Sequence, residues 1–128
     1  MTHKLKEILS QLETTCSPKS IFLYGSQARS DARPDSDYEL GVLLERDKYV
    51  GRAVLKDAVK DLNVSVYPFY VDDFMAGNPD TPFNKNIYLR EIITSGKTIF
   101  GARIVENMKL PAVDILDFIH PLEGCGEV

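Results

Sequence analysis

Two groups of side chains with complementary chemistry lie close together in the first third of the chain. Gly25 and Ser26 follow a short apolar run, and Asp37 and Glu39 stand two positions apart in the next one. Glycine permits close approach to the backbone, and a serine at a helix N-terminus offers a hydroxyl and N–H groups where partial positive charge suits phosphate. Two carboxylates on one face of a strand suit Mg²⁺, which prefers carboxylates together with substrate phosphates. This combination is the equipment for phosphoryl or nucleotidyl transfer.

Two arginines extend the candidate anion site. Arg29 and Arg33 lie just beyond the Gly-Ser pair, where their guanidinium groups are placed to complete a phosphate cradle. Taken singly, each feature has a common structural explanation, because Gly-Ser pairs form turns, Asp-x-Glu pairs face solvent and arginines occupy surfaces. The argument for a site therefore depends on their combination and spacing.

Apolar spacing predicts the elements that position these residues. In chain order we expect a helix over 4–13, strand 21–24, a short helix over 26–30, strand 37–45, helix 47–61, strand 64–70, a polar loop over 72–82, helix 83–95 and strand 98–101. Pro68 predicts an edge position or a bulge for the third strand. This order predicts an α/β (α+β) fold in which a small mixed β-sheet is flanked by helices.

The same spacing predicts which side chains are buried. Strand alternation places Asp37 and Glu39 on one face of their strand and Leu40 and Val42 on the other. In helix 47–61 the candidate core residues are Tyr49 or Val50, Ala53, Val54, Ala58 and Val59.

Composition narrows the class of protein. The chain has 128 residues, a hydrophobic fraction of 44% and a net charge of −4, which favour one globular domain and argue against general binding to duplex DNA or anionic lipid. No run approaches the ~20 apolar residues of a membrane span, and the first residues lack the apolar region of a signal peptide. Cys16 and Cys125 have no metal-ligand spacing, so two free thiols are expected. We therefore expect a cytoplasmic protein.

The segment over residues 21–44 resembles the signature of the polymerase-β-type nucleotidyltransferases. In that signature a hydrophobic strand ends in Gly-Ser and is followed about ten residues later by Asp-hydrophobic-Asp/Glu-hydrophobic. Ala28-Arg29 and the Asp-Ser-Asp sequence over 35–37 are most similar to the minimal nucleotidyltransferases, which are small domains often found as antitoxins. Leu89 to Ile92, with Gly96 and Lys97, is similar to the family's closing helix.

The resemblance implies roles for individual residues. Gly25 and Ser26, with Arg29, would bind the nucleotide phosphates. Asp37 and Glu39 would be the catalytic carboxylates and would bind one or two Mg²⁺ ions. The reaction would move NMP, expected to be AMP from ATP, to a hydroxyl. The acceptor would be a partner such as a HEPN-type toxin or another protein, and a homo-oligomer also stays open.

One position departs from the family pattern. Active members usually carry a third carboxylate on a later strand, where it ligates metal and acts as base. The matching position here holds Ser65, which cannot replace a carboxylate as base at pH 7. Asp61, Asp72 and Asp73 would supply the missing group only if this strand had another register. The alternative function is therefore a catalytically degenerate antitoxin or regulatory module that binds nucleotide and acts by protein contact.

The resemblance and the residue pattern divide the chain into two parts. Residues 1–101 are expected to form the nucleotidyltransferase domain, and residues 102–128 a C-terminal tail. The tail is unusually apolar, with Ile104, Val105, Met108, Leu110, Val113, Ile115, Leu116, Phe118 and Ile119. It would either complete the domain's own core or dock onto another chain.

Overall fold

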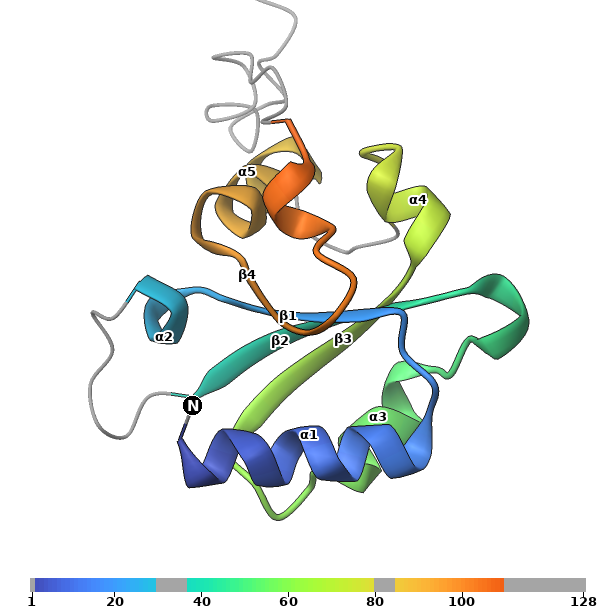
Figure 1. Cartoon of the computed structure of the whole chain (residues 1–128), viewed down its shortest axis with the longest axis vertical. Helices are drawn as coiled ribbons and strands as arrows, with labels where there is room; N and C mark the ends of the chain where they lie inside the picture. Colours follow the sequence, from blue (N-terminus) through green and yellow to red (C-terminus); the bar gives the residue numbers. More distant parts are fainter. Residues whose placement is uncertain (1, 30–36, 80–84, 110–128) are drawn as a thin grey trace, which may run out of the picture.

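The computed structural model describes residues 2–29, 37–79 and 85–109, and its centre is a four-stranded mixed sheet (Figure 1). The strands are β1 (Ser20–Tyr24), β2 (Tyr38–Leu44), β3 (Val64–Tyr70) and β4 (Lys97–Gly101), in the spatial order β3-β2-β1-β4. β1 pairs antiparallel with both β2 and β4, and β2 pairs parallel with β3. The predicted mixed sheet is confirmed. Pro68 lies in an edge strand, where a residue without an N–H is tolerated.

Helices cover both faces of the sheet (Figure 1). On one face lie α1 (His3–Thr15) and α3 (Arg52–Ala58). On the other lie α4 (Val71–Met75), α5 (Lys85–Ser95) and the 3-10 turn η2 (Val105–Asn107). The predicted stripe of α1 is confirmed, since all four of its apolar residues are buried; they are Leu5, Ile8, Leu9 and Leu12.

Side chains of β2 alternate between two separate cores. Leu40, Val42 and Leu44 pack with α1 and α3, whereas Leu43 packs with the aromatic and aliphatic side chains under α4 and α5. The predicted alternation is confirmed. Because Glu39 shares the parity of Leu43, its side chain lies on the α5 face.

The helix predicted over 47–61 is wrong in length and in its buried face. A 3-10 turn, η1 (Arg46–Lys48), and an extended segment precede α3, which begins after Gly51. This later start turns Leu55 into the core and leaves Val54 53% exposed, although Val59 is buried and Val50 packs against the core as predicted. Tyr49 lies outside the helix and stacks on Tyr70, with ring centroids 4.2 Å apart.

The polar loop predicted to begin at residue 72 is also wrong over its first residues. α4 forms there because Phe74 is apolar enough to anchor a helical turn in the core, 5.2 Å from the ring of Phe22. The last residues of that predicted loop lie outside the described part of the chain. α5 ends before Gly96 as predicted, and residues 83 and 84 of that prediction also lie outside.

The first residues of the predicted C-terminal tail belong to the folded core. Ile104 and Val105, from the segment predicted to be a tail, are buried in the same core as α5, and everything after Lys109 lies outside the described residues. Cys16 is a free thiol, and Cys125 lies outside as well. Within the described ranges no helix is long and apolar enough to cross a membrane.

Candidate active site

Gly25 forms the turn between β1 and the short helix α2 (Ser26–Arg29). Its φ of +78° is a backbone conformation that residues with a Cβ rarely adopt. A Cβ at this position would also overlap the carboxylate of Glu39. The carbonyl of Gly25 accepts hydrogen bonds from the N–H groups of Ala28 and Arg29, each at 3.1 Å. The glycine therefore starts α2 and lets the backbone lie against the candidate metal-binding side chain.

Side chains of α5 hold the Gly-Ser turn in place through hydrogen bonds and an ion pair. The N–H of Gly25 donates to Ser95 Oγ at 3.0 Å, and the Ser95 hydroxyl donates to the carbonyl of Glu91 at 2.8 Å. Arg29 forms an ion pair with the carboxylate of Glu91 at 2.7 Å. Arg29, expected to bind phosphate, thus lies beside the turn and is oriented by α5. The sequence analysis assigned no role to Glu91 or Ser95, although the closing-helix resemblance marked this segment.

Glu39 is the half-buried carboxylate of the site. Burial raises its pKa, the nearby charges of Glu91 and Asp37 raise it further, and Arg29 opposes the rise. Asp37 is exposed and lies immediately before β2, two residues from Glu39. A cation bound here would offset the cost of ionising Glu39, so the donor set fits a divalent ion shared with phosphate oxygens.

The pairing register between β2 and β3 identifies the residue next to Glu39 on the neighbouring strand. β2 and β3 pair in parallel, and Glu39 is the direct neighbour of Ser65. Ser65, the position that the family resemblance matches to the third carboxylate, therefore lies next to Glu39. Asp72 and Asp73 lie past the opposite end of β3, where both bind Arg46, at 2.9 and 2.7 Å. Across the described ranges, no three His, Cys, Asp or Glu side chains are grouped closely enough to hold a metal.

Tyrosines form the wall next to Glu39. Tyr24, the cross-strand neighbour of Glu39, shares a 2.8 Å hydrogen bond with Tyr88 between their hydroxyls. Burial raises the pKa of Tyr88 to about 12 and that of Tyr24 still further, and the charge of Glu39 contributes to both shifts. Both phenols are therefore neutral near pH 7. Tyr88 is another residue that the sequence analysis did not single out.

Most of the predicted site residues lie in the described part of the chain. Gly25, Ser26 and Arg29 lie at the C-terminal end of β1, and Asp37 and Glu39 at the adjacent N-terminal end of β2. Arg33 lies outside the described residues. The arrangement brings the Gly-Ser turn and the carboxylate pair together at one end of the central strands β1 and β2, a geometry compatible with nucleotidyl transfer.

Known proteins share this fold. No curated protein sequence gives a significant match. The crystal structure of a toxin-antitoxin with AMP-PNP superposes with a TM-score of 0.56 at 15% identity, covering 79% of this chain and 75% of that one. A mutant of the toxin-antitoxin MntA-HpeT gives 0.53 at 16%, with coverages of 79% and 75%. Spectinomycin adenyltransferase AAD(9) from Enterococcus faecialis, with ATP and spectinomycin, gives 0.54 at 15%, with coverages of 90% and 60%.

At these identities the structural matches show a common fold. The sequence itself matches the family described as "Polymerase beta, Nucleotidyltransferase" over residues 3–103, which includes the Gly-Ser turn, the Asp-x-Glu strand and α5. The match spans most of the chain and agrees with the resemblance seen in residues 21–44. The chain therefore belongs to the polymerase beta nucleotidyltransferase family.

Proposed function

We propose that this protein is a Mg²⁺-dependent nucleotidyltransferase that moves AMP from ATP to a hydroxyl on a partner protein. The observation that carries the proposal is the contact between Gly25 and Glu39: the backbone of the anion-binding turn lies directly against a half-buried carboxylate. This contact would place nucleotide phosphates and a carboxylate-bound cation side by side. Toxin-antitoxin structures among the fold matches support a protein partner, such as a HEPN-type toxin.

In this reaction, different residues of the chain would bind the phosphates, hold the metal ion and shield the site. The turn at Gly25 and Ser26 would bind the phosphates, and Arg29, held by Glu91, would contribute positive charge at the rim. Asp37 and Glu39 would hold Mg²⁺, which stabilises negative charge on attacking and leaving oxygens. The acceptor oxygen would bond to the α-phosphorus as the bond to the β-phosphate oxygen breaks, and pyrophosphate would leave. Tyr24 and Tyr88, as neutral phenols, would close the side of the site without adding charge.

A second candidate function follows from Ser65. Its place beside Glu39 leaves the carboxylate pair without a third acidic neighbour on β3. The acceptor proton would then have to pass to water or to a group that the acceptor brings with it. If neither serves, the chain would bind ATP and act by contact, as an antitoxin or regulatory module without transfer.

Calorimetric titration with ATP, with and without Mg²⁺, tests the site itself. We expect Mg²⁺-dependent binding that the double variant Asp37→Ala/Glu39→Ala loses. Glu7→Ala/Asp57→Ala is the matched control, because it removes two acidic residues from an exposed surface on the α1–α3 side. Equal loss in both variants, or unchanged Mg²⁺ dependence in the first, would contradict the proposal.

Transfer is tested separately with ATP labelled at the α-phosphate. The chain is incubated alone and with a HEPN-type partner, and label on protein is measured together with pyrophosphate release. Mg²⁺-dependent labelling of the partner supports the transferase. Binding of ATP with no labelling and no pyrophosphate supports the second candidate. Ser65→Asp sharpens the distinction, because restoring a carboxylate beside Glu39 should raise any transfer rate.

A further inference from the structure

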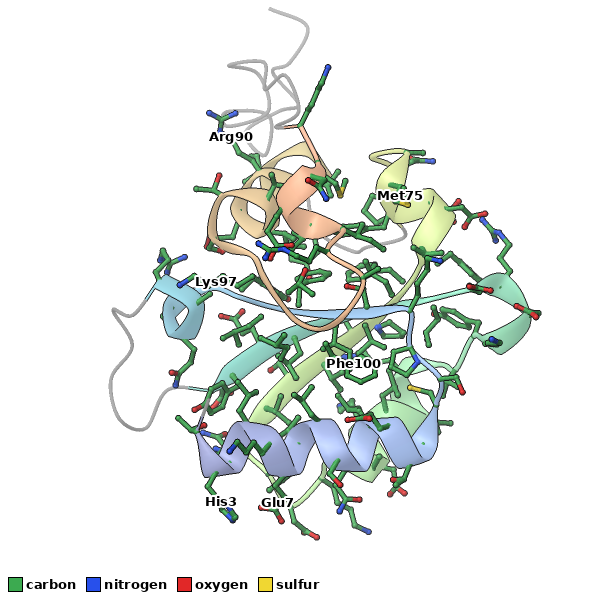
Figure 2. The ribbon with its side chains drawn as sticks, in the orientation of Figure 1. His3, Glu7, Met75, Arg90, Lys97 and Phe100 are labelled. Carbon is green, nitrogen blue, oxygen red and sulfur yellow. The ribbon has the colours of Figure 1, made fainter. Side chains whose placement is uncertain are left out.

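An apolar groove lies between α4, α5 and η2, on the far side of α5 from the candidate active site. It has a volume of about 630 Å³, and its walls include Met75, Leu89, Ile93, Ile104 and Met108. Met75, which projects from α4, is 59% exposed (Figure 2). Met75 thus adds exposed apolar surface to the rim of an apolar cavity, and such contiguous apolar surface is typical of a region that another segment covers.

The chain leaves the described structure at the rim of this groove. Lys109, the last described residue, is itself one of the lining residues, and residues 110–128 follow it. Pro111 and Pro121 bracket a segment with the spacing of a short helix, since proline is favoured at the first helical position and stops a helix beyond its end. The apolar residues of that segment are Val113, Ile115, Leu116, Phe118 and Ile119.

Charge also matches between the groove and this segment. Arg103 and Lys109 are the charged residues on the groove wall. Residues 110–128 contain no lysine or arginine and four acidic residues, which are Asp114, Asp117, Glu123 and Glu127. An apolar segment with acidic positions therefore begins at the edge of an apolar groove with a basic rim.

We propose that residues 112–120 dock into the groove of their own chain and cover Met75. The covalent connection through Leu110 and Pro111 favours this segment over a second copy or a partner protein. A segment that starts at the rim has an effective concentration on the order of millimolar for its own groove, far above that of a free second copy or partner. Two residues, Leu110 and Pro111, span up to about 7 Å when extended, enough to turn the segment back over the wall.

Docking would act on the active site through α5. Leu89 and Ile93 face the groove, whereas Glu91 and Ser95 hold Arg29 and the Gly25 turn on the other side of the same helix. A segment that packs on the groove would hold α5 against the sheet. The tail would thus be a stabilising part of the domain and would support the position of the Gly-Ser turn.

Disulfide trapping in the full chain tests the docking. In a Cys16→Ser/Cys125→Ser background, Met75→Cys is combined in turn with Ile115→Cys, Phe118→Cys and Ile119→Cys. Val54→Cys with the same partners is the matched control, because Val54 is 53% exposed on the opposite face of the sheet. We expect an intramolecular disulfide with Cys at position 75 for at least one partner, forming roughly tenfold faster or more than with position 54.

The other outcomes overturn the proposal. Disulfide-linked dimers specific to position 75 would mean that a second copy fills the groove, and equal slow rates at both positions would mean that the tail does not dock. A second measurement is independent of cysteines. Met75→Gln should lower the urea midpoint of unfolding clearly more than Val54→Gln does, and equal small effects would show that Met75 stays exposed in the full chain.

Discussion

The β2–β3 strand pair carries acidic residues at both ends, and their pKa values are shifted in opposite directions. We call the end at Glu39 and Ser65 the near end, and the end beside Asp72 and Asp73 the far end. At the far end, Asp72 and Asp73 bind Arg46, whose guanidinium also lies 4.2 Å from the ring of Tyr70, and Arg46 holds the pKa of Asp72 below its usual range. At the near end, Glu39 is half-buried, and burial and neighbouring acids raise its pKa. At the far end one guanidinium binds both carboxylates, while at the near end Arg29 is paired with Glu91 and only partly offsets the negative charges around Glu39. The near end therefore keeps more negative charge available for a cation. Acidic residues alone do not indicate a site; their lack of compensation does.

The largest expected difference between these regions comes from their glycines and lies in ATP binding rather than in stability. Gly25 and Gly77 have φ values of +78° and +76°, so an alanine at either position should cost about 1–2 kcal/mol of strain. A Cβ at Gly77 meets nothing, whereas at Gly25 it overlaps the carboxylate of Glu39, which is the far end of a flexible side chain and must shift at little further cost in stability. Urea denaturation of Gly25→Ala and Gly77→Ala measures both costs.

The same pair of variants sharpens the functional comparison. Gly25→Ala should abolish Mg²⁺-dependent ATP binding in the fraction that stays folded, because Glu39 must move. Gly77→Ala should bind ATP as the wild type does. If the two variants keep similar affinity, Gly25 is an ordinary turn residue and the near end is not a site.

A smaller effect is expected from the serine that holds the Gly25 turn. Ser95→Ala leaves the buried N–H of Gly25 without its acceptor and should cost about 1–3 kcal/mol. Thr15 is a matched control, since its hydroxyl also donates to the carbonyl four residues earlier but is exposed. Thr15→Ala should change the free energy of unfolding by less than about 0.5 kcal/mol. Equal effects of the two variants on unfolding, measured by urea denaturation, would show that α5 does not support the turn.

Most of the near end could be predicted from local sequence. Gly25, Ser26, Asp37 and Glu39 follow strand-to-turn and alternation rules that act over a few residues. Ser65 was assigned to the site by the family resemblance, and its parallel pairing beside Glu39 comes from the structure. The roles of Glu91, Ser95 and Tyr88 could not be read this way. Each acts on a residue more than sixty positions away, so only the packing of α5 on the sheet brings them to the site.

The far end was predicted less well, for a related reason. Helix 47–61 was extended through Tyr49 because its spacing fits a helical stripe, but Tyr49 instead stacks on Tyr70, a contact formed only once β3 is in place. Gly51 then sets where α3 begins, and that start decides which apolar residues are buried. The short α4 was missed because one buried residue, Phe74, gives no period to recognise.

The smallest expected effect concerns how stability depends on pH at the two ends, measured by urea denaturation without added metal. The pKa of Glu39 is raised above its ordinary value of 4.5, so the folded state holds this proton more tightly than the unfolded state. Its contribution to stability is therefore lost as the pH rises from 4.5 through the folded-state pKa. Asp72 has the opposite sign, because its pKa is lowered from 3.8 and its contribution is lost as the pH falls below that value.

The two windows lie on different sides of pH 4, so neutral variants separate them. Glu39→Gln should flatten the decline in stability above pH 4.5 and leave the acid limb unchanged. Asp72→Asn should affect only the acid limb, and weakly, because its ion pair with Arg46 is exposed and Asp73 remains as a second partner. A Glu39→Gln profile parallel to that of the wild type would mean that the near end is already compensated. The electrostatic argument for a cation at Glu39 would then fail, even though the backbone geometry of the turn would be unchanged.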